Sequence, residues 1–155
     1  MPSPLIRLVS GAVLIDGLLG GASLDRTFTQ LPAVRRAGAR PRAGPRAFFW
    51  YPTLAISGTT LSVSAAVKCR SENVSRLSSA GLIAAAVLAT GGLLATIGGA
   101  PSQLRVRDVG DDRAEPQTSF EEVDFWQDIR GPLQGLAFAA NVLSLLSLLA
   151  EEGHH

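Results

Sequence analysis

Residues 77–104 read LSSAGLIAAAVLATGGLLATIGGAPSQL, a run of 28 residues without a charged side chain. The hydrocarbon core of a bilayer is about 30 Å thick, and a helix needs roughly 20 apolar residues to cross it. Two further uncharged runs, at 47–67 and 131–150, contain 21 and 20 residues. Soluble domains of this size seldom sustain such runs without charged residues at helical spacing. The sequence therefore predicts an integral membrane protein.

A fourth apolar stretch, at residues 4–24, is hydrophobic except for Arg7 near its start and Asp16 near its middle. The small residues at 20–23 imitate a signal-peptide cleavage site, but a carboxylate would interrupt the apolar core of a signal. The stretch is long enough to span a bilayer, so we interpret it as a retained helix. The predicted fold is an all-α integral membrane bundle of four transmembrane helices.

The composition fits one transmembrane domain. Of the 155 residues, 46% are hydrophobic and 17% are charged, and the formal net charge is +1. No basic surface with interleaved aromatic residues is apparent, so nucleic acid is not an expected partner. The single cysteine, Cys69, excludes an intrachain disulfide and a cysteine-only zinc site. The domain is predicted to cover residues 1–155, with spans at about 4–24, 47–67, 77–100 and 130–150.

The predicted loops differ in charge and suggest an orientation. The first loop, residues 25–46, is basic, and the third, residues 101–124, is largely acidic. With four spans these two loops share a side and hold most of the arginines, so the positive-inside rule predicts that they are cytoplasmic. Both termini and the second loop, residues 68–76, would then be lumenal or extracellular. The triplet at 73–75, Asn-Val-Ser, is an acceptor sequence for N-glycosylation and agrees with that orientation.

Small and hydroxyl-bearing residues recur at helical spacing within the second and third spans. Helices in lipid pack through small residues and isolated polar contacts, because burying apolar area gives little advantage in an apolar solvent. The recurring residues of the second span are Thr53, Ser57, Thr60 and Ser64. Those of the third span are Gly81, Ala85, Ala89, Gly92, Thr96 and Gly99. We interpret both stripes mainly as helix-packing surfaces.

The fourth span carries polar residues on one helical face, namely Arg130, Gln134, Asn141 and Ser144. This face should look inward, because a charged residue facing lipid at mid-depth costs at least ~2.5 kcal/mol. The same cost predicts that Asp16 faces the interior or a hydrated cavity. Candidate partners for its carboxylate are Arg130, Asn141 and the hydroxyls of Ser57 and Thr60. Two roles for Asp16 stay open: a structural anchor between the first and fourth helices, or a functional site.

Aromatic residues gather where the first and third loops meet the membrane, and include Phe48, Phe49, Trp50, Tyr51, Phe120, Phe125 and Trp126. Most of them fit an interfacial belt. The same rings would border the open end of a polar cavity, where a flat aromatic ligand could stack. The only two histidines are at 154 and 155, in a predicted tail, which excludes histidine-ligated haem, glutamate-histidine di-iron sites and a serine-histidine triad. No metal site is predicted.

Three short segments carry a likeness to a known family. The segment at 30–34, QLPAV, follows the first span, and the segment at 101–104, PSQL, follows the third. The fourth span opens at 125–133 with FWQDIRGPL, an aromatic pair and an arginine before the apolar run. In this layout the chain resembles the DUF1772 or anthrone oxygenase-like four-span membrane proteins. The family commonly has a histidine just before this arginine, whereas this chain has Asp128 and Ile129 there.

The resemblance implies a cofactor-independent oxygenase that oxidises an aromatic polyketide, of the anthrone-to-anthraquinone type, with O₂. Such an enzyme needs a base, donors for a developing oxyanion and a dry aromatic slot. The base would be Asp16 or Asp128. The catalytic residues would be Asp16, Asp128, Arg130 and Asn141. The substrate-binding residues would be Trp50, Ser57, Thr60, Trp126 and Gln134.

A second hypothesis is a non-catalytic four-span accessory or assembly subunit of a larger membrane complex. Two further classes are disfavoured: the arginine-asparagine-glutamate pattern of membrane glutathione transferases is missing from the second span, and a transporter would show repeats or broken helices. An enzyme predicts a closed polar cavity lined by Asp16 and Asn141. An accessory subunit predicts that the same residues pack tightly or turn outward. The expected partners are lipid and a hydrophobic aromatic molecule, with a homo-oligomer or a larger complex as the assembly.

Overall fold

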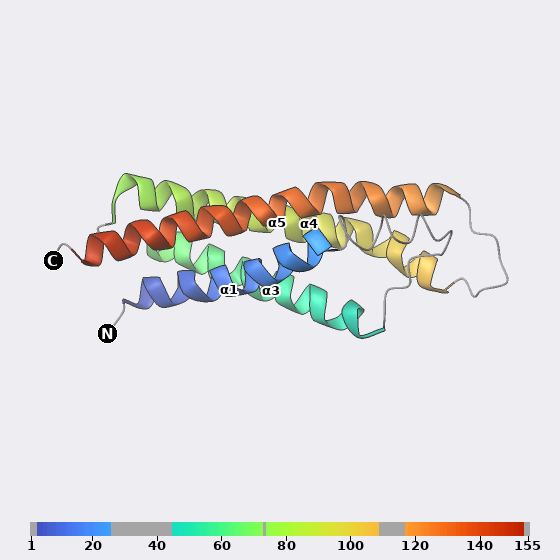
Figure 1. The fold of residues 1–155 in the computed structure, drawn as a ribbon, viewed down its shortest axis with the longest axis horizontal. Helices are drawn as coiled ribbons and strands as arrows, with labels where there is room; N and C mark the ends of the chain where they lie inside the picture. The colour runs from blue at the N-terminus through green and yellow to red at the C-terminus, as the bar shows by residue number, and fades with distance from the viewer. Residues whose placement is uncertain (1–2, 26–44, 73, 109–116, 154–155) are drawn as a thin grey trace.

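The computed structural model describes residues 3–25, 45–72, 74–108 and 117–153, and within these ranges the chain is all-helical (Figure 1). This confirms the predicted all-α class. The four helices are α1 (Pro4–Asp25), α3 (Pro45–Lys68), α4 (Arg76–Asp108) and α5 (Gln117–Glu152).

The helices form an antiparallel bundle in which chain neighbours are also neighbours in space. The helix α1 contacts α3, α3 contacts α4, α4 contacts α5, and α5 closes the ring against α1. The start of α1 and the end of α5 lie at one end of the bundle, together with the turn between α3 and α4 (Figure 1). We name this the terminal end. The arrangement is an up-down-up-down four-helix bundle.

Three of the described helices are long and apolar enough to cross a membrane. The candidate spans are Pro4–Ser23, Arg76–Pro101 and Phe125–Glu152, and they coincide with the first, third and fourth predicted spans. The second predicted span, at 47–67, is not among them. It forms the helix α3, but six serine and threonine residues between positions 53 and 64 lower its hydropathy.

Two helices extend beyond their predicted spans. The helix α4 continues through Pro101 to Asp108, and α5 begins at Gln117, although the sequence predicted a loop from 101 to 124. A proline inside a transmembrane helix is tolerated when neighbouring groups satisfy the freed backbone. The apolar pattern marks the stretch that lipid accepts, so it does not locate the ends of the helices.

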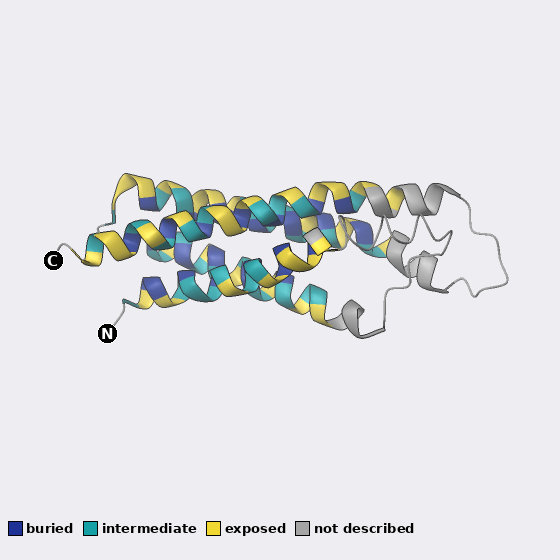
Figure 2. Cartoon of the chain, viewed as in Figure 1, coloured by how far each residue is buried: buried dark blue, intermediate teal, exposed yellow. Residues whose placement is uncertain are grey.

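Buried and exposed residues alternate along each helix (Figure 2). Most of the buried residues are small or polar, and large apolar side chains are frequent among the exposed ones. On α4, for example, Ala85 and Ala89 are buried, whereas Val87 and Leu94 are more than 60% exposed. Large apolar side chains on the outside are typical of a surface that faces lipid. Near the terminal end, one apolar cluster fills the interior and consists of Leu5, Ile6, Val9, Ala65, Cys69, Leu82 and Leu148.

The buried face of α3 differs from the predicted hydroxyl stripe. The buried residues of α3 are Ala55, Gly58, Ser62 and Ala65, at spacings of three and four, and Cys69 continues this row directly after the helix. Of the predicted stripe, Thr53 and Thr60 are exposed, and Ser57 and Ser64 are half-buried. The smallest side chains decide which face packs, because they allow the closest approach of two helix backbones. On α4 the predicted stripe does face inward, with Ala85, Ala89, Gly92 and Gly99 buried.

Candidate functional site

A buried carboxylate and a buried amide meet near the middle of the bundle. Asp16 on α1 is only 5% exposed, and Asn141 on α5 is fully buried. The Asn141 Nδ2 donates to Asp16 Oδ2 at 2.8 Å and to Ser62 Oγ on α3 at 3.1 Å. A glycine on α3 provides the necessary space, since a Cβ at Gly58 would lie 2.7 Å from Asp16 Oδ1. We name Asp16, Ser62 and Asn141 the Asp16 cluster; it connects three helices.

A second polar cluster lies closer to the end of the bundle opposite the terminal end. The hydroxyls of Tyr51 and Ser23 each lie 2.8 Å from Gln134 Oε1 and 2.5 Å from one another. The Arg130 guanidinium carbon lies 4.3 Å from the centroid of the Tyr51 ring, and its Nη2 donates to Gln127 Oε1. A cation over an aromatic face is attracted by the ring quadrupole. We name Ser23, Tyr51, Gln127, Arg130 and Gln134 the Arg130 cluster.

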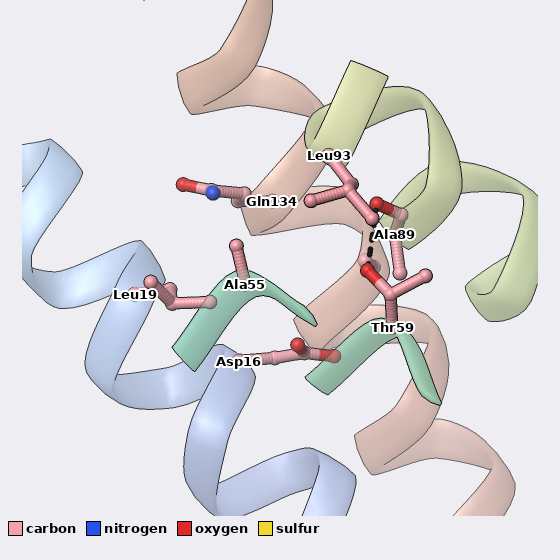
Figure 3. A pocket seen from close by; sticks show the side chains of 8 residues that line it. Asp16, Leu19, Ala55, Thr59, Ala89, Leu93 and Gln134 are labelled. Atoms are coloured by element: carbon pink, nitrogen blue, oxygen red, sulfur yellow. Dashed lines mark hydrogen bonds between the residues drawn. The ribbon is translucent and has the colours of Figure 1, made fainter. Parts of the chain in front are cut away.

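A small cavity separates the two clusters. It is lined by Asp16, Leu19, Ala55, Thr59, Ala89, Leu93, Gln134 and Ala137 (Figure 3). Its volume of about 10 Å³ is close to the minimum that one water molecule requires. The Thr59 hydroxyl is already engaged, since it donates to the Ala89 carbonyl at 3.2 Å. Pockets that hold organic ligands measure about 300–1,000 Å³, so this cavity has no room for a polyketide.

Only some of the residues predicted to be catalytic lie close together in the structure. Asp16 and Asn141 are in direct contact, and Asn141 was one of the partners considered for Asp16. Arg130 is buried, as its helical face predicted, but it belongs to the Arg130 cluster. Asp128 is exposed on the outside of α5. The interior therefore offers Asp16 as the carboxylate, and Asp128 does not share its site.

The residues predicted to bind substrate are dispersed. Trp50 on α3 is 67% exposed. Trp126 on α5 covers α4, where a Cβ added to Gly98 or Gly99 would lie about 3 Å from its side chain. Ser57 is half-buried, and Thr60 is exposed and donates to the Ile56 carbonyl at 2.7 Å. Gln134 is buried and joins the Arg130 cluster. In the described part of the chain, the two tryptophans do not form a slot.

Sequence reasoning missed four polar residues of the two clusters: Ser23, Tyr51, Ser62 and Gln127. Tyr51 was assigned to the interfacial belt because it follows Phe49 and Trp50. A usable signal existed for Ser62, which lies four residues after Gly58 and three before Ala65 on the stripe of smallest side chains. No local pattern indicates that Ser23 and Tyr51 meet Gln134, because that contact depends on the tertiary arrangement.

A third polar cluster lies at the terminal end, beside a cavity of about 250 Å³ that Glu151 helps to line. The Glu151 carboxylate accepts from Ser78 Oγ at 2.7 Å, from Ser75 N at 3.3 Å and from Ser147 Oγ at 3.4 Å. The Ser75 Oγ accepts from Ser78 N at 3.1 Å, which makes Ser75 the N-cap of α4. A carboxylate near a helix N-terminus is favoured by the helix dipole. The last turn of α5 thus supplies hydrogen-bond acceptors to the beginning of α4.

Comparison with protein-family models, with curated proteins and with solved structures gives no match for this chain. Of the three segments that resemble DUF1772 proteins, residues 30–34 lie outside the described residues. The glycosylation triplet cannot be placed either, since Asn73 is also outside them. Among the described residues, no group of three or more histidine, cysteine, aspartate or glutamate side chains is placed to hold a metal ion.

Proposed function

We propose that this protein is a non-catalytic, four-span membrane subunit that associates with a larger membrane complex. The observation that carries the proposal is the closed packing around Asp16, which leaves space for about one water molecule beside Gln134. An oxygenase acting on fused aromatic rings needs a far larger pocket. Tight contact between Asp16 and Asn141 is the arrangement that an accessory subunit predicts.

We infer that α3 crosses the membrane together with the three candidate spans. Its 24 residues extend over about 36 Å at 1.5 Å per residue. Its hydroxyls have partners that lipid cannot provide: Thr59 and Thr60 donate to helix carbonyls, and Ser62 accepts from Asn141. Its outer face carries apolar side chains such as Ile56, which is 54% exposed. The outer surface of α3 therefore suits lipid although its average hydropathy is low.

The outer face of α5 supports association with another helix. A Cβ added to Gly131 or Gly135 would meet nothing within 4 Å. A Cβ added to Gly58, Gly81 or Gly98 would instead collide with a side chain of this chain. Glycines four residues apart allow two transmembrane helices to approach closely. The first pair is thus free for a second helix, and Gly58, Gly81 and Gly98 are used within the bundle.

Native mass spectrometry of the protein extracted from its source membranes tests the association. We expect a complex of fixed stoichiometry for the wild-type chain, and its loss in the double variant Gly131→Leu and Gly135→Leu. The matched control is Ala84→Leu, a small-to-large change at an exposed position of α4. A wild-type chain that is monomeric under these conditions, or a complex that survives the double variant, contradicts the association through this face.

The orientation that we propose places residues 25–46 and 109–116 in the cytoplasm, from the positive-inside bias. In a Cys69→Ala background, single cysteines report it through labelling with an impermeant maleimide added to intact cells. We expect labelling of Ser71→Cys and Gly153→Cys, which are exposed at the terminal end, and protection of Glu122→Cys. Labelling of Glu122→Cys together with protection of Ser71→Cys and Gly153→Cys would show that the protein has the opposite orientation.

The oxygenase implied by the family resemblance is the second candidate. It is favoured by one observation: Arg130, predicted to be catalytic, and Gln134, predicted to bind substrate, lie in one buried cluster with Tyr51. O₂ uptake and quinone formation from an anthrone test it in mild detergent, against empty micelles because anthrones oxidise spontaneously. We expect the protein to oxidise the anthrone no faster than the empty micelles do. A faster rate that Asp16→Asn or Asp128→Asn abolishes would establish the oxygenase and overturn the accessory-subunit proposal.

A further inference from the structure

We propose that the cavity at the terminal end binds a small organic cation of the ammonium class, either a free amine such as choline or the ammonium of a phospholipid head group. The site is separate from the Asp16 and Arg130 clusters, and it does not depend on the association proposed for α5. It rests on the apolar floor of the cavity, on the carboxylates at its rim and on the contacts that hold these carboxylates.

The cavity is formed where the beginning of α1, the turn after α3 and the last turns of α5 meet, and its volume is about 250 Å³. It is lined by Ser3, Leu5, Ile6, Glu72, Val74, Leu148, Glu151 and Glu152. A cavity of about 150 Å³ is large enough for benzene, so by proportion this one has room for about ten non-hydrogen atoms. A head group or a small amine fits this space, whereas a larger organic ligand does not.

The floor of the cavity is apolar and buried. Leu5 and Leu148 belong to the apolar cluster of the terminal end and are 1% and 5% exposed. Ile6 belongs to the same cluster, and Val74 packs against it. Ligand pockets are mostly apolar and carry a small number of polar groups that fix orientation. The floor therefore favours the carbon atoms of a ligand over an inorganic ion.

The charged groups at the rim are all negative. Glu72, Glu151 and Glu152 contribute carboxylates, and none of the described residues that line the cavity is basic. The rim therefore attracts a cation and repels an anion. In the described part of the chain, no three acidic side chains converge closely enough to hold a metal ion. Carboxylates spread around an apolar floor suit a larger cation, whose methyl or methylene groups contact the floor while its charge faces the rim.

The carboxylates are held in place before a ligand binds. Glu152 Oε1 accepts from the backbone amide of Ser3 at 3.2 Å. Glu151 accepts from three serines, as described above, and is fixed against the beginning of α4. Glu72 lies 3.7 Å from Lys68 Nζ, in an ion pair about one-third exposed, which solvent screens. Preorganised groups lose little freedom on binding, which favours the affinity of the site.

The depth of the cavity gives the ligand two possible sources. The candidate spans of α1 and α5 begin at Pro4 and end at Glu152, so the cavity lies at the membrane surface. Lipid head groups occupy this level, and solutes of the aqueous phase also reach it. A phospholipid head group and a free amine present the same ammonium chemistry to the rim.

Titration of the purified full chain in dodecyl maltoside with choline tests the site, with saturation-transfer NMR as the measurement. The control ligand is 3,3-dimethylbutan-1-ol, which has the shape of choline without its charge. We expect saturable binding of choline, at least about tenfold tighter than that of the alcohol, because only choline is attracted by the carboxylates. Equal affinities, or no saturable binding of choline, would overturn the proposal.

Two variants separate the cavity from a diffuse acidic surface. The double variant Glu72→Gln and Glu152→Gln should weaken choline binding by at least about tenfold. The matched control is Glu122→Gln, the same change at an exposed position near the opposite end, which should bind as the wild type does. Val74→Phe fills the cavity and keeps all three carboxylates, and it should abolish binding. Choline binding that survives Val74→Phe, in a chain whose buried Cys69 stays protected from thiol reagents, contradicts the cavity as the site.

The same titration in phosphatidylcholine nanodiscs distinguishes the two sources. We expect choline to bind more weakly there than in maltoside, because the lipid head group then competes for the cavity. An unchanged affinity would assign the site to free amines and would still support an ammonium site.

Discussion

Replacement of Asn141 by alanine tests whether the Asp16 cluster holds the bundle together. The substitution removes two contacts between helices, the one to Asp16 Oδ2 at 2.8 Å and the one to Ser62 Oγ at 3.1 Å. A hydrogen bond between transmembrane helices contributes about 0.6 kcal/mol on average and about 1.7 at most. A bond to a charged group contributes about 1.5–3 kcal/mol in folded proteins generally. We therefore expect Asn141→Ala to lower the free energy of unfolding by about 2–3 kcal/mol.

The control for this loss is Ser144→Ala, one turn further along the same buried face. The Ser144 hydroxyl packs against Gly81 of α4 but donates to the Ala140 carbonyl in its own helix, so its removal breaks no hydrogen bond that the described structure shows between helices. We expect this variant to lose about 0.5 kcal/mol or less. The difference between the two variants isolates the contribution of the Asp16 cluster from that of a deleted polar group.

The assay is unfolding in mixed micelles with increasing dodecyl sulfate, followed by thiol labelling of Cys69. This residue is the only cysteine and is 2% exposed, so it reacts when the bundle opens. Asn141→Ala should become labelled at a lower fraction of dodecyl sulfate than Ser144→Ala. Equal midpoints for the two variants would refute the reasoning, since Asp16 would then obtain equivalent contacts elsewhere.

Two further predictions use the same assay. Gly98→Ala should cost about 1–3 kcal/mol because the new methyl lies 2.8 Å from Trp126, whereas Gly91→Ala, whose nearest contact is 3.5 Å, should be neutral or stabilise by up to about 1 kcal/mol. If Gly91→Ala lowered stability more than Gly98→Ala, Trp126 would not pack against α4. Tyr51→Phe should lower stability by about 1 kcal/mol through the lost bond to Gln134, and an unchanged midpoint would argue against the hydroxyl contacts.

The sequence was sufficient for the helices and for the buried polar face of α5. Charge-free runs locate two of the three candidate spans, those of α4 and α5, because lipid excludes charge over a fixed thickness; the charge-free run at 47–67 forms α3, which is not among the candidates. The cost of a charged group in lipid likewise predicts that Arg130, Gln134 and Asn141 face inward, and all three are buried. The pairing of Asp16 with Asn141 was one of several open possibilities, and only the arrangement of α1 beside α5 selects it.

The remaining features depend on geometry that no local pattern carries. The hydroxyl pattern of α3 predicted the wrong face, because Gly58 and Ala55 control how closely the helices approach. The aromatic slot was implied by the family resemblance, yet Trp50 is on the exterior and Trp126 fills the space above two glycines. Side-chain type indicates what a residue can contact, and the crossing of the helices decides what it does contact.

The cap that α5 provides for α4 has a consequence for biosynthesis. Glu151 belongs to the last turn of α5, and it accepts from the backbone of Ser75 at the beginning of α4. A ribosome makes Ser75 well before Glu151, so α4 enters the membrane with that amide lacking its final partner. Insertion of α5 then supplies it, so the second half of the bundle reaches its mature state only after the ribosome has made Glu151.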